Sequence, residues 1–544
     1  MLGLMMDTPL TLTVIMRHGD RNHARREIVS VTHDHALHRY TFADCFARTR
    51  RLANALDRLG AGADARIATL AWNDFRHLEL YYAVSCSGRV CHTVNPRLFE
   101  EQIVYILNHA EAEWVFVDPA FVPRLESLAA QCPAVKGYVV LSDEAHMPQT
   151  TLPNARCYET LVAAAPDTYA WPELDEKRAS GLCYTSGTTG NPKGVLYNHR
   201  SAVLMAYAGA LPDTCGVSAM DAILPIVPMF HVNAWGMPFS AVLTGAKLVF
   251  PGPTLSDPKR LADLITSEGV TISAGVPTVC LPLLAHARDN GRSLAPLNRM
   301  VIGGSACPLS MMEEFRDRHQ VRVVHAWGMT EMSPLGTVNA LTPETAPLTG
   351  AALADQMCSQ GRAIPGVELK ITDDDNRELP WDGKASGALK VRGYWVCRDY
   401  YRLDGTGGAH DADGWFATGD VASIDPNGFM RITDRAKDVI KSGGEWISSI
   451  DLENTAMGHP SVAEAAVIGV NHPKWQERPL LVVVRKQGVE VSATELLHYF
   501  EGKVAKWWIP EDVAFVDELP HTATGKLSKL ELRKRFAAYR FPGT

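Results

Sequence analysis

The chain has 544 residues, and at roughly 150 residues per domain this length predicts about three to four structural units. Hydrophobic residues make up 46% and charged residues 21%, a balance that excludes a disordered scaffold. Lys and Arg number 53 against 61 Asp and Glu, which gives a formal net charge of -8. A general nucleic-acid coat is therefore not expected, because phosphate neutralisation needs a basic face.

The cysteines and the N-terminal segment indicate the compartment. Eleven cysteines are scattered along the chain without a C-x-x-C pair, a pattern that favours free thiols in a reducing environment. Asp7 interrupts the apolar start of the chain and no basic segment precedes it, so no signal peptide is predicted. No apolar run approaches the ~18 to 20 residues of a membrane span. We therefore expect a cytoplasmic protein without an integral membrane segment.

The N-terminal two thirds of the chain alternate between helical and strand-like segments. Residues 11–15 (TLTVI) have the composition of a strand, and residues 41–59 predict an amphipathic helix with Thr41 as its N-cap. Short runs of Val, Ile and Leu then recur between helical segments as far as residues 298–304. This alternation predicts β-α units and largely parallel sheets that helices cover on both faces.

The pattern changes after about residue 365, where short strands are separated by Gly, Asp, Pro and Asn turns. A compact α+β pattern begins at Lys437. Its expected elements are two helices and two strands, at residues 451–459, 493–505, 463–470 and 479–486. We therefore expect a large domain of residues 1–436, with a β-rich subdomain at 365–436, and a small C-terminal domain of residues 437–544.

The most informative segment is YTSGTTGNPKG, residues 184–194. Its hydroxyl side chains, glycines and single lysine could wrap a polyphosphate with backbone N–H groups. It is not a Walker A loop, because Pro192 precedes Lys193 and Gly194 follows it. A Ser/Thr/Gly surface turn is the alternative for a loop of this composition.

This loop resembles the phosphate-loop signature of the acyl-adenylate-forming enzymes, which include acyl-CoA synthetases, luciferases and the adenylation domains of peptide synthetases. Further segments match that family in its usual order: HAWGMTEMSP (325–334), GWFATGDVA (414–422), DRAKDVIKSGGEWIS (434–448) and TATGKL (522–527). Within the family, PMFHVNAWG (228–236) and NHPKWQERP (471–479) look most like bacterial medium-chain fatty acyl-CoA ligases and 3-methylmercaptopropionate-CoA ligases.

The resemblance implies an α/β fold, with a large N-terminal domain of fused α/β sheets plus a β-rich subdomain and a small mobile α+β lid at the C-terminus. It implies an AMP-forming acid–thiol ligase that uses ATP, Mg²⁺ and coenzyme A. The expected substrates are short- or medium-chain fatty acids, with 3-methylmercaptopropionate or an aryl acid as the alternative. A homodimer is a further expectation from the family.

The same resemblance assigns the catalytic groups. Lys526 is expected to bridge the substrate carboxylate and the α-phosphate, two anions that repel by about 4 kcal/mol at 4 Å in a partly screened site. Glu331 is the expected Mg²⁺ anchor, with Thr185 beside the metal, because Mg²⁺ takes hard oxygen ligands. Thr330 is expected to hydrogen-bond the α-phosphate.

The remaining residues are assigned to nucleotide binding, acid binding and the hinge. Asp420 is expected to bind the ribose hydroxyls with Arg435 as its helper, because one carboxylate can accept from two hydroxyls. Lys437 matches the family's hinge position. The other expected nucleotide or coenzyme contacts are Ser186, Gly187, Thr188, Thr189, Lys193, His325, Ala326, Trp327 and Lys441. The expected acyl-side residues are His231, Trp235 as a pocket wall or gate, Gly303, Gly304, Ser305 and Trp446.

Two alternatives belong to other functional classes. The segment MRHGDR, residues 16–21, resembles the R-H-G-x-R motif of histidine phosphatases, in which His18 would accept a phosphoryl group. His23 stands where that motif usually has proline. The second alternative is a protein that binds nucleotide without catalysis, which the presence of Lys193, Glu331 and Lys526 weakens.

Overall fold

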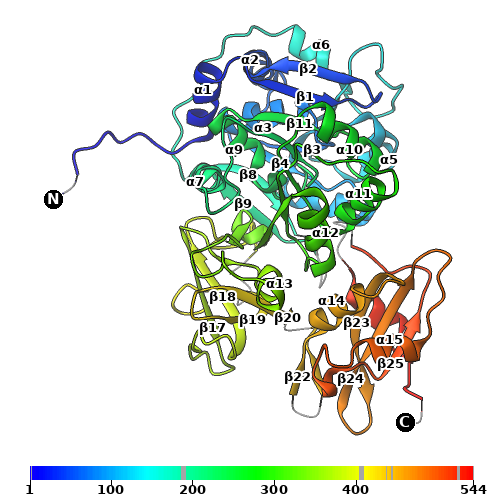
Figure 1. Cartoon of the computed structure of the whole chain (residues 1–544). Coiled ribbons are helices and arrows are strands. Elements are labelled where there is room, and N and C mark those ends of the chain that lie inside the picture. The colour runs from blue at the N-terminus through cyan, green and yellow to red at the C-terminus, as the bar shows by residue number, and fades with distance from the viewer. Residues whose placement is uncertain are drawn as a thin grey trace.

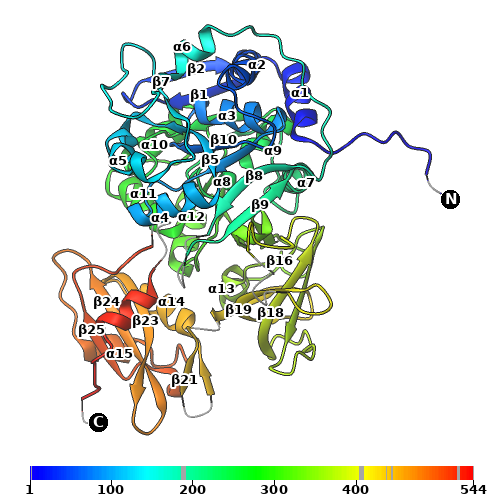
Figure 2. The same ribbon diagram turned by 180° about the vertical axis from the view of Figure 1, so that it is seen from behind.

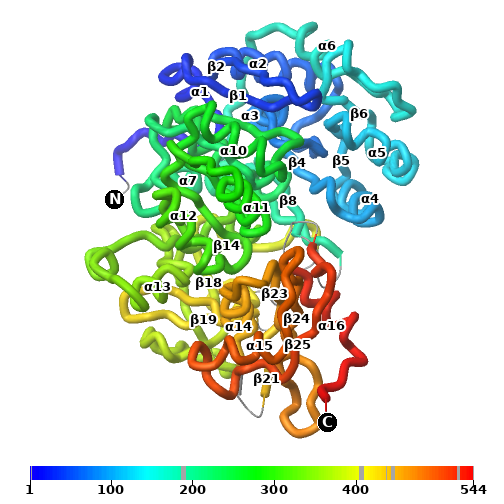
Figure 3. Tube along the Cα trace, turned by 45° about the vertical axis from the view of Figure 1, so that its right-hand side comes forward, coloured from blue at the N-terminus to red at the C-terminus, as the bar shows by residue number. Residues whose placement is uncertain are grey.

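The computed structural model describes residues 1, 3–185, 191–403, 410–435, 438–442, 445–522 and 527–542, without the side chains of Glu445 and Trp446. Figures 1 and 2 show a large upper body, with a β-rich unit and the C-terminal domain side by side below it. Figure 3 shows the same arrangement from a third side, with the C-terminal domain in front of the β-rich unit. Within the described residues, no helix combines the length and apolar character that a bilayer span requires.

A seven-stranded sheet forms one half of the body, in the order β7-β6-β5-β3-β4-β8-β9. Its strands are β3 (Arg66–Leu70), β4 (Val90–Thr93), β5 (Ala112–Val117), β6 (Gly137–Val140), β7 (Arg156–Cys157), β8 (Ala179–Tyr184) and β9 (Gly194–Asn198). All neighbours are parallel except β8 and β9, which form an antiparallel pair. Its helices are α2 (Phe42–Arg58), α3 (Phe75–Cys86), α4 (Glu100–His109), α5 (Val122–Leu128), α6 (Tyr158–Ala163) and α7 (His199–Ala210).

A nine-stranded sheet forms the other half, in the order β16-β15-β14-β13-β12-β10-β11-β1-β2. Its strands are β1 (Glu27–Val31), β2 (Leu37–Thr41), β10 (Ala222–Pro225), β11 (Lys247–Phe250), β12 (Ile272–Gly275), β13 (Arg299–Ile302), β14 (Arg322–Gly328), β15 (Leu335–Val338) and β16 (Arg362–Ala363). Its helices are α1 (Leu12–Asn22), α8 (Val232–Trp235), α9 (Met237–Thr244), α10 (Pro258–Ser267), α11 (Pro277–Asp289), α12 (Leu309–His319) and α13 (Gly350–Cys358).

The two sheets share one core, and Asn73 ties their strand ends together. The strand order around β3 and β5 reverses direction, and ligands of open α/β sheets bind at the carboxyl ends of strands at such a reversal. Asn73, just after β3, donates its amide to the carbonyls of Pro225 and Val227 at 2.9 Å. Its side-chain oxygen accepts from the backbone N–H of Met229. These bonds place the segment that follows β10 against the reversal point.

The β-rich unit is a four-stranded antiparallel sheet of β17 (Val367–Thr372), β18 (Ser386–Gly393), β19 (Phe416–Ile424) and β20 (Met430–Arg435). In β18 buried and more exposed residues alternate, as expected for a sheet with one face on a core. In register, Asp420 of β19 pairs with Arg435 of β20. The sheet therefore presents these two residues together at one end.

The C-terminal domain packs helices on a second mixed sheet. Its strands are β21 (Ile440–Ser442), β22 (Glu445–Ile447), β23 (Val462–His472), β24 (Gln476–Arg485) and β25 (Asp512–Phe515), and its helices are α14 (Ser449–Met457), α15 (Ala493–Tyr499) and α16 (Lys529–Arg535). Short 3-10 turns complete the chain at Pro119–Phe121, Ala129–Gln131, Thr330–Met332 and Lys506–Trp508.

The structure confirms most of the predicted elements and corrects two. The helix over 41–59 is α2, and Thr41 and Asp44 form its capping box. The TLTVI prediction is wrong, because these residues enter the helix α1. Leu12, Ile15, Met16 and Gly19 are among its buried positions, a spacing that suits a helix with one face on α9. The helix predicted at 493–505 is shorter and ends at Tyr499.

Candidate active site

A cavity of about 710 Å³ lies where the body, the β-rich unit and the C-terminal domain meet. Most of the described residues predicted for the site line it: Thr185, Lys193, His231, Trp235, Gly303, Gly304, Ser305, Ala326, Trp327, Thr330, Glu331 and Arg435. They come from loops and strand ends far apart in the chain. The fold therefore brings the separate sequence motifs to one place.

One end of the cavity has a carboxylate held from two sides. Asp420 is 5% exposed, and the Trp327 indole N–H donates to its Oδ2 at 3.0 Å. The Arg435 guanidinium pairs with its Oδ1 at 3.2 Å. Trp327 and Arg435 line the cavity, so Asp420 lies directly behind its wall. Three residues predicted to contact the nucleotide are therefore joined by one hydrogen bond and one ion pair.

Glu331 is a second buried carboxylate, in the turn that follows β14. It is 7% exposed, and the Tyr400 hydroxyl donates to its Oε1 at 2.7 Å. Burial and the neighbouring Glu331 carboxylate raise the pKa of Tyr400, so its hydroxyl remains a donor. The neighbouring turn is fixed by Tyr197, whose hydroxyl donates to the carbonyl of Thr330 at 2.7 Å. Glu331 is thus a carboxylate in a fixed position on the cavity wall.

Thr185 and Lys193 border the β8–β9 connection and hold each other. The Thr185 N–H donates to the Lys193 carbonyl at 2.9 Å, and the Lys193 N–H donates to the Thr185 hydroxyl at 3.2 Å. The Lys193 ammonium lies 4.8 Å from the centre of the Tyr400 ring. Tyr400 therefore contacts both the lysine and the carboxylate of the site. Lys193 and Glu331 both line the cavity, so a cation and a carboxylate border the same space.

The apolar end of the cavity includes an unusual left-handed turn. Val232, Asn233, Ala234 and Trp235 all have positive φ angles, between 46° and 56°. Residues other than glycine adopt this conformation at a cost of roughly 1–2 kcal/mol each, and it clusters at functional sites. The turn places Trp235 against Gly303, where a Cβ atom would come 3.4 Å from the indole and 2.8 Å from the Ala326 carbonyl. Gly303 therefore leaves room for both.

Some predicted residues lie away from the cavity or outside the described residues. His325 is 2% exposed and absent from the cavity wall, and burial lowers its pKa to about 4. Lys441 lies exposed on β21 and does not line the cavity. Ser186, Gly187, Thr188, Thr189, Lys437, Lys526 and the side chain of Trp446 lie outside the described residues. Thr522 and Leu527, which flank the Lys526 segment, both line the cavity.

The structure adds residues that the motifs missed. Tyr197 and Tyr400 fix the turn around Glu331, but nothing in their local sequence marks them. Arg97 lines the cavity and lies 5.8 Å from the Trp72 ring centre and 6.0 Å from that of Phe230. The sequence does contain a signal for Arg97, because the polar turn NPR follows a buried parallel strand, at the edge of the sheet where ligands bind.

The phosphatase-like segment has a structural explanation. It lies in α1, where Gly19 is buried and a Cβ atom there would come 2.5 Å from Val242 of α9. His18 is exposed on the other side of the helix and contacts Asn22. The glycine thus permits close packing of two helices, and His18 lies away from the cavity.

Site and fold together define an enzyme with a polar end suited to a nucleotide and an apolar end suited to a second ligand. The chain belongs to the AMP-binding enzyme family. The AMP-binding enzyme model matches residues 16–401, and the model of the AMP-binding enzyme C-terminal domain matches residues 451–526. The family expected from the motifs is therefore confirmed.

Two relatives match nearly the whole chain. The medium-chain-fatty-acid–CoA ligase of Ectopseudomonas oleovorans is 50% identical over 98% of both chains. The 3-methylmercaptopropionyl-CoA ligase of Ruegeria lacuscaerulensis is also 50% identical, over 98% of this chain and 99% of the relative. The crystal structure of the anthranilate CoA ligase AuaEII with anthranoyl-AMP matches with a TM-score of 0.87. It covers 98% of this chain and 99% of its own at 24% identity, which confirms the predicted fold.

Proposed function

We propose that this enzyme joins a carboxylic acid to coenzyme A through an acyl-adenylate, and that the acid is a short- or medium-chain fatty acid. The observation that carries the proposal is the single cavity that joins the Asp420 and Glu331 end to the apolar end at Trp235. Such a cavity can hold ATP and an acyl chain with the reacting atoms between them. The acid 3-methylmercaptopropionate is the second candidate, because a relative named for it is 50% identical.

In the first half-reaction a carboxylate oxygen attacks the α-phosphorus, and the bond to the bridging oxygen of pyrophosphate breaks. Both reactants are anions, so cations and N–H dipoles must surround the transferred phosphorus. In the proposal Lys526 bridges the carboxylate and the α-phosphate, Lys193 holds the departing phosphates, and Thr330 donates to the α-phosphate. Asp420 accepts from the ribose hydroxyls, with Arg435 and Trp327 holding the carboxylate in place.

Glu331 and Thr185 are the residues that would hold Mg²⁺. The donor set fits, because Mg²⁺ takes one or two protein oxygen ligands and fills its other positions with water and phosphate oxygens. Among the described residues no group of three metal-binding side chains occurs, so a site completed by the nucleotide is the arrangement that these residues suit. The ion would neutralise charge on the phosphates.

In the second half-reaction the thiol sulfur attacks the acyl carbonyl, the bond to the AMP phosphate oxygen breaks, and the thiol proton leaves. The proposal has residues 437–544 turn about Lys437 between the two steps, which withdraws Lys526 and brings Lys441 and Trp446 to the site. Domain closure and reopening of this kind need only a few residues that absorb the dihedral change.

A screen for AMP release tests the substrate. The purified enzyme is given ATP, Mg²⁺, coenzyme A and single acids of three to fourteen carbons, with 3-methylmercaptopropionate and cinnamate included. We expect AMP and acyl-CoA in equal amounts with a medium-chain acid, and no acid-dependent ATP–pyrophosphate exchange in Lys526→Ala. Nucleotide binding without AMP release from any acid would indicate a binding protein instead.

The proposal extends to the compartment and the assembly. All eleven cysteines are unpaired, which favours a reducing compartment such as the cytoplasm. A homodimer remains a prediction, which light scattering coupled to size-exclusion chromatography would check.

A further inference from the structure

Four polar residues, which we call the Asp434 cluster, meet beside the cavity: Asp434, Ser449, Glu453 and Lys529. Asp434 Oδ2 accepts from the backbone N–H of Ser449 at 2.8 Å and from its hydroxyl at 2.6 Å. The Lys529 ammonium donates to the same hydroxyl oxygen and pairs with Glu453 at 2.8 Å. The hydroxyl of Ser449 is thus the bridge between Asp434 and Lys529.

The cluster is nearly closed to solvent. Ser449 is fully buried, Asp434 is 1% exposed, and the Lys529 side chain is 11% exposed. Burial by itself lowers the pKa of Lys529, but the Glu453 and Asp434 carboxylates outweigh it and raise the pKa. The ammonium therefore stays charged. Moving the Lys529 ammonium away from these carboxylates would leave buried charges unpaired, so the side chain is held in this position.

The cluster crosses the expected hinge. Asp434 belongs to β20 of the β-rich unit, whereas Ser449, Glu453 and Lys529 belong to α14 and α16 of the C-terminal domain. A second ion pair, Arg533 with Asp438 at 2.7 Å, lies wholly on the C-terminal side. A rotation about the expected hinge at Lys437 would therefore break the contacts between β20 and α14, which are those of Ser449 with Asp434 and of the Ser448 hydroxyl with the Thr433 carbonyl. It would leave the Lys529–Glu453 and Arg533–Asp438 pairs intact.

Lys529 also stands next to the proposed catalytic lysine in sequence. It is the first residue of α16 and follows Lys526 by three positions. Thr522 and Leu527 line the cavity on either side of the segment that carries Lys526. Holding Lys529 therefore fixes the first turn of the helix that follows Lys526 in the chain.

We propose that Lys529 is a positioning residue for the first half-reaction, which docks the C-terminal domain on Asp434 through Ser449 and so holds the start of α16, three residues after Lys526, at the cavity. The inference rests on the proposed function, in which Lys526 acts in adenylation. Release of the domain for the second half-reaction then requires the loss of the Asp434–Ser449 and Thr433–Ser448 hydrogen bonds, while Lys529 keeps its pair with Glu453.

A different experimental result is expected if the Lys529–Glu453 ion pair has only a structural role. If Lys529 only held α16 on α14, its loss would weaken the C-terminal domain and slow both half-reactions alike. Docking on Asp434 instead affects one orientation of the domain. The two half-reactions measured separately, together with the exposure of the hinge, distinguish these roles.

The sharpest variant is Ser449→Ala, which removes the bridging hydroxyl and leaves the Lys529–Glu453 pair in place. We expect acid-dependent ATP–pyrophosphate exchange to fall about tenfold, the usual effect of losing hydrogen bonds to charged groups. Thioester formation from pre-made acyl-adenylate should stay within about twofold. Lys529→Met should show the same split with a larger loss, and Lys529→Arg should recover part of it.

Thr455→Val is the matched control. Thr455 lies on the same helix, and its hydroxyl donates to the Asp451 carbonyl at 2.8 Å within that helix. Both half-reactions should stay at the wild-type rate. Equal loss of both half-reactions in Ser449→Ala, or unchanged exchange, would overturn the proposal.

Limited trypsin digestion tests the docking without any catalysis. Cleavage after Arg435 or Lys437 should be several-fold faster in Ser449→Ala than in the wild type, because an undocked hinge is more often open to the protease. An unchanged cleavage rate contradicts the docking role, even if no acid is turned over. Wild-type enzyme that shows no exchange with any acid would instead contradict the proposed function.

Discussion

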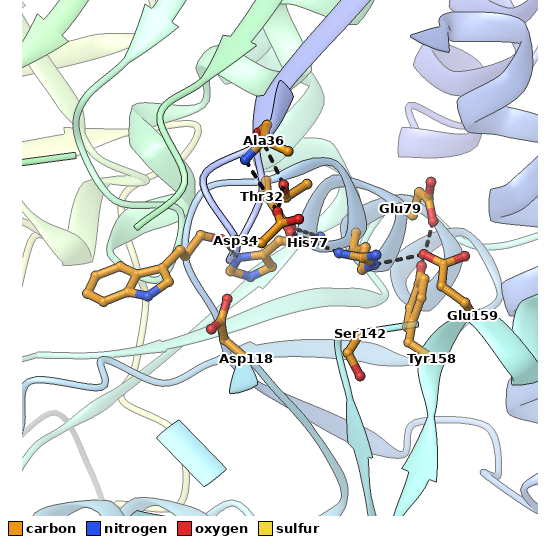
Figure 4. Close-up of polar contacts among 12 residues, drawn as sticks. Thr32, Asp34, Ala36, His77, Glu79, Asp118, Ser142, Tyr158 and Glu159 are labelled. Carbon is orange, nitrogen blue, oxygen red and sulfur yellow. Dashed lines mark hydrogen bonds and ion pairs between the residues drawn. The ribbon is translucent and has the colours of Figure 1, made fainter. Parts of the chain in front are cut away.

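The body contains a buried set of charges that contrasts with the Asp434 cluster. We call it the Arg48 network: Arg48, Arg76, Glu79, Tyr158 and Glu159. Arg48 pairs with Glu79 at 2.7 Å and with Glu159 at 2.9 Å, and the Tyr158 hydroxyl donates to Glu79 at 2.6 Å. Arg76 pairs with the same Glu159 at 2.8 Å. Figure 4 shows Glu79, Tyr158 and Glu159 close together, with dashed lines along their contacts.

The Arg48 network and the Asp434 cluster both neutralise their charges by ion pairs and hydrogen bonds, but they join different parts of the molecule. The Arg48 network links α2, α3 and α6, which belong to one body and stay together. The Asp434 cluster links the β-rich unit to a domain that the proposed mechanism turns. In the proposed mechanism, buried ion pairs of the same chemistry therefore stabilise the fold within the body and control the order of the two half-reactions at the C-terminal domain.

The largest effect is expected from Arg48→Met. It leaves Glu79, whose side chain is fully buried, with Tyr158 as its remaining partner in the network. Breaking a buried pair on one side costs about 3–5 kcal/mol, and urea unfolding should show that loss. The ratio of the two half-reaction rates should not change. Arg58→Met, on the same helix but exposed, is the control. A selective loss of one half-reaction in Arg48→Met would contradict a purely stabilising role for the Arg48 network.

A smaller effect is expected at Asp118, which directly follows β5 and lies near His77 in Figure 4. Burial, and then the nearby Asp74 carboxylate, raise the pKa of Asp118 from 3.8 to about 7. The folded state therefore binds this proton more tightly than the unfolded state. The stabilisation that protonated Asp118 contributes is fully present below pH 3.8 and is lost as the pH rises to about 7.

Asp118→Asn should remove this pH dependence. The slope of unfolding free energy against pH should become less negative by about 1 kcal/mol per pH unit within that window. Asp374→Asn, in an exposed turn, is the control and should leave the slope unchanged. Thermal unfolding followed at several pH values measures both. A slope equal to that of the wild type would show that Asp118 titrates normally.

The smallest effect is expected from Arg288→Ala, which removes an exposed ion pair of the body. Arg288 lies 3.4 Å from Glu314, and its side chain is 47% exposed. Exposed pairs of this kind contribute about 0–1 kcal/mol, so the unfolding free energy should change by less than about 0.5 kcal/mol. A loss of unfolding free energy as large as that of Arg48→Met would mean that burial does not determine how much these ion pairs contribute to stability.

The sequence predicted which residues meet at the cavity where those residues belong to a motif of their own. The β8–β9 connection, Glu331, and the pairing of Asp420 with Arg435 all come from short segments with their own signal. Tyr400 and Arg97 were missed because their roles depend on contacts with distant segments. Trp327 is an intermediate case. The motif placed it at the nucleotide end, but only the fold showed that its N–H holds Asp420.

The sequence by itself determined the family, the alternation of sheets and helices, and the order of the motifs, because these depend on local patterns of polarity and turn residues. The tertiary structure decided which residues meet. It buried His325, which the motif had assigned to the nucleotide, and it built the left-handed turn that carries Trp235. It also joined Lys529 to Asp434 through the hydroxyl of Ser449, across the predicted hinge. Such contacts follow from packing between segments far apart in the chain, which no local pattern encodes.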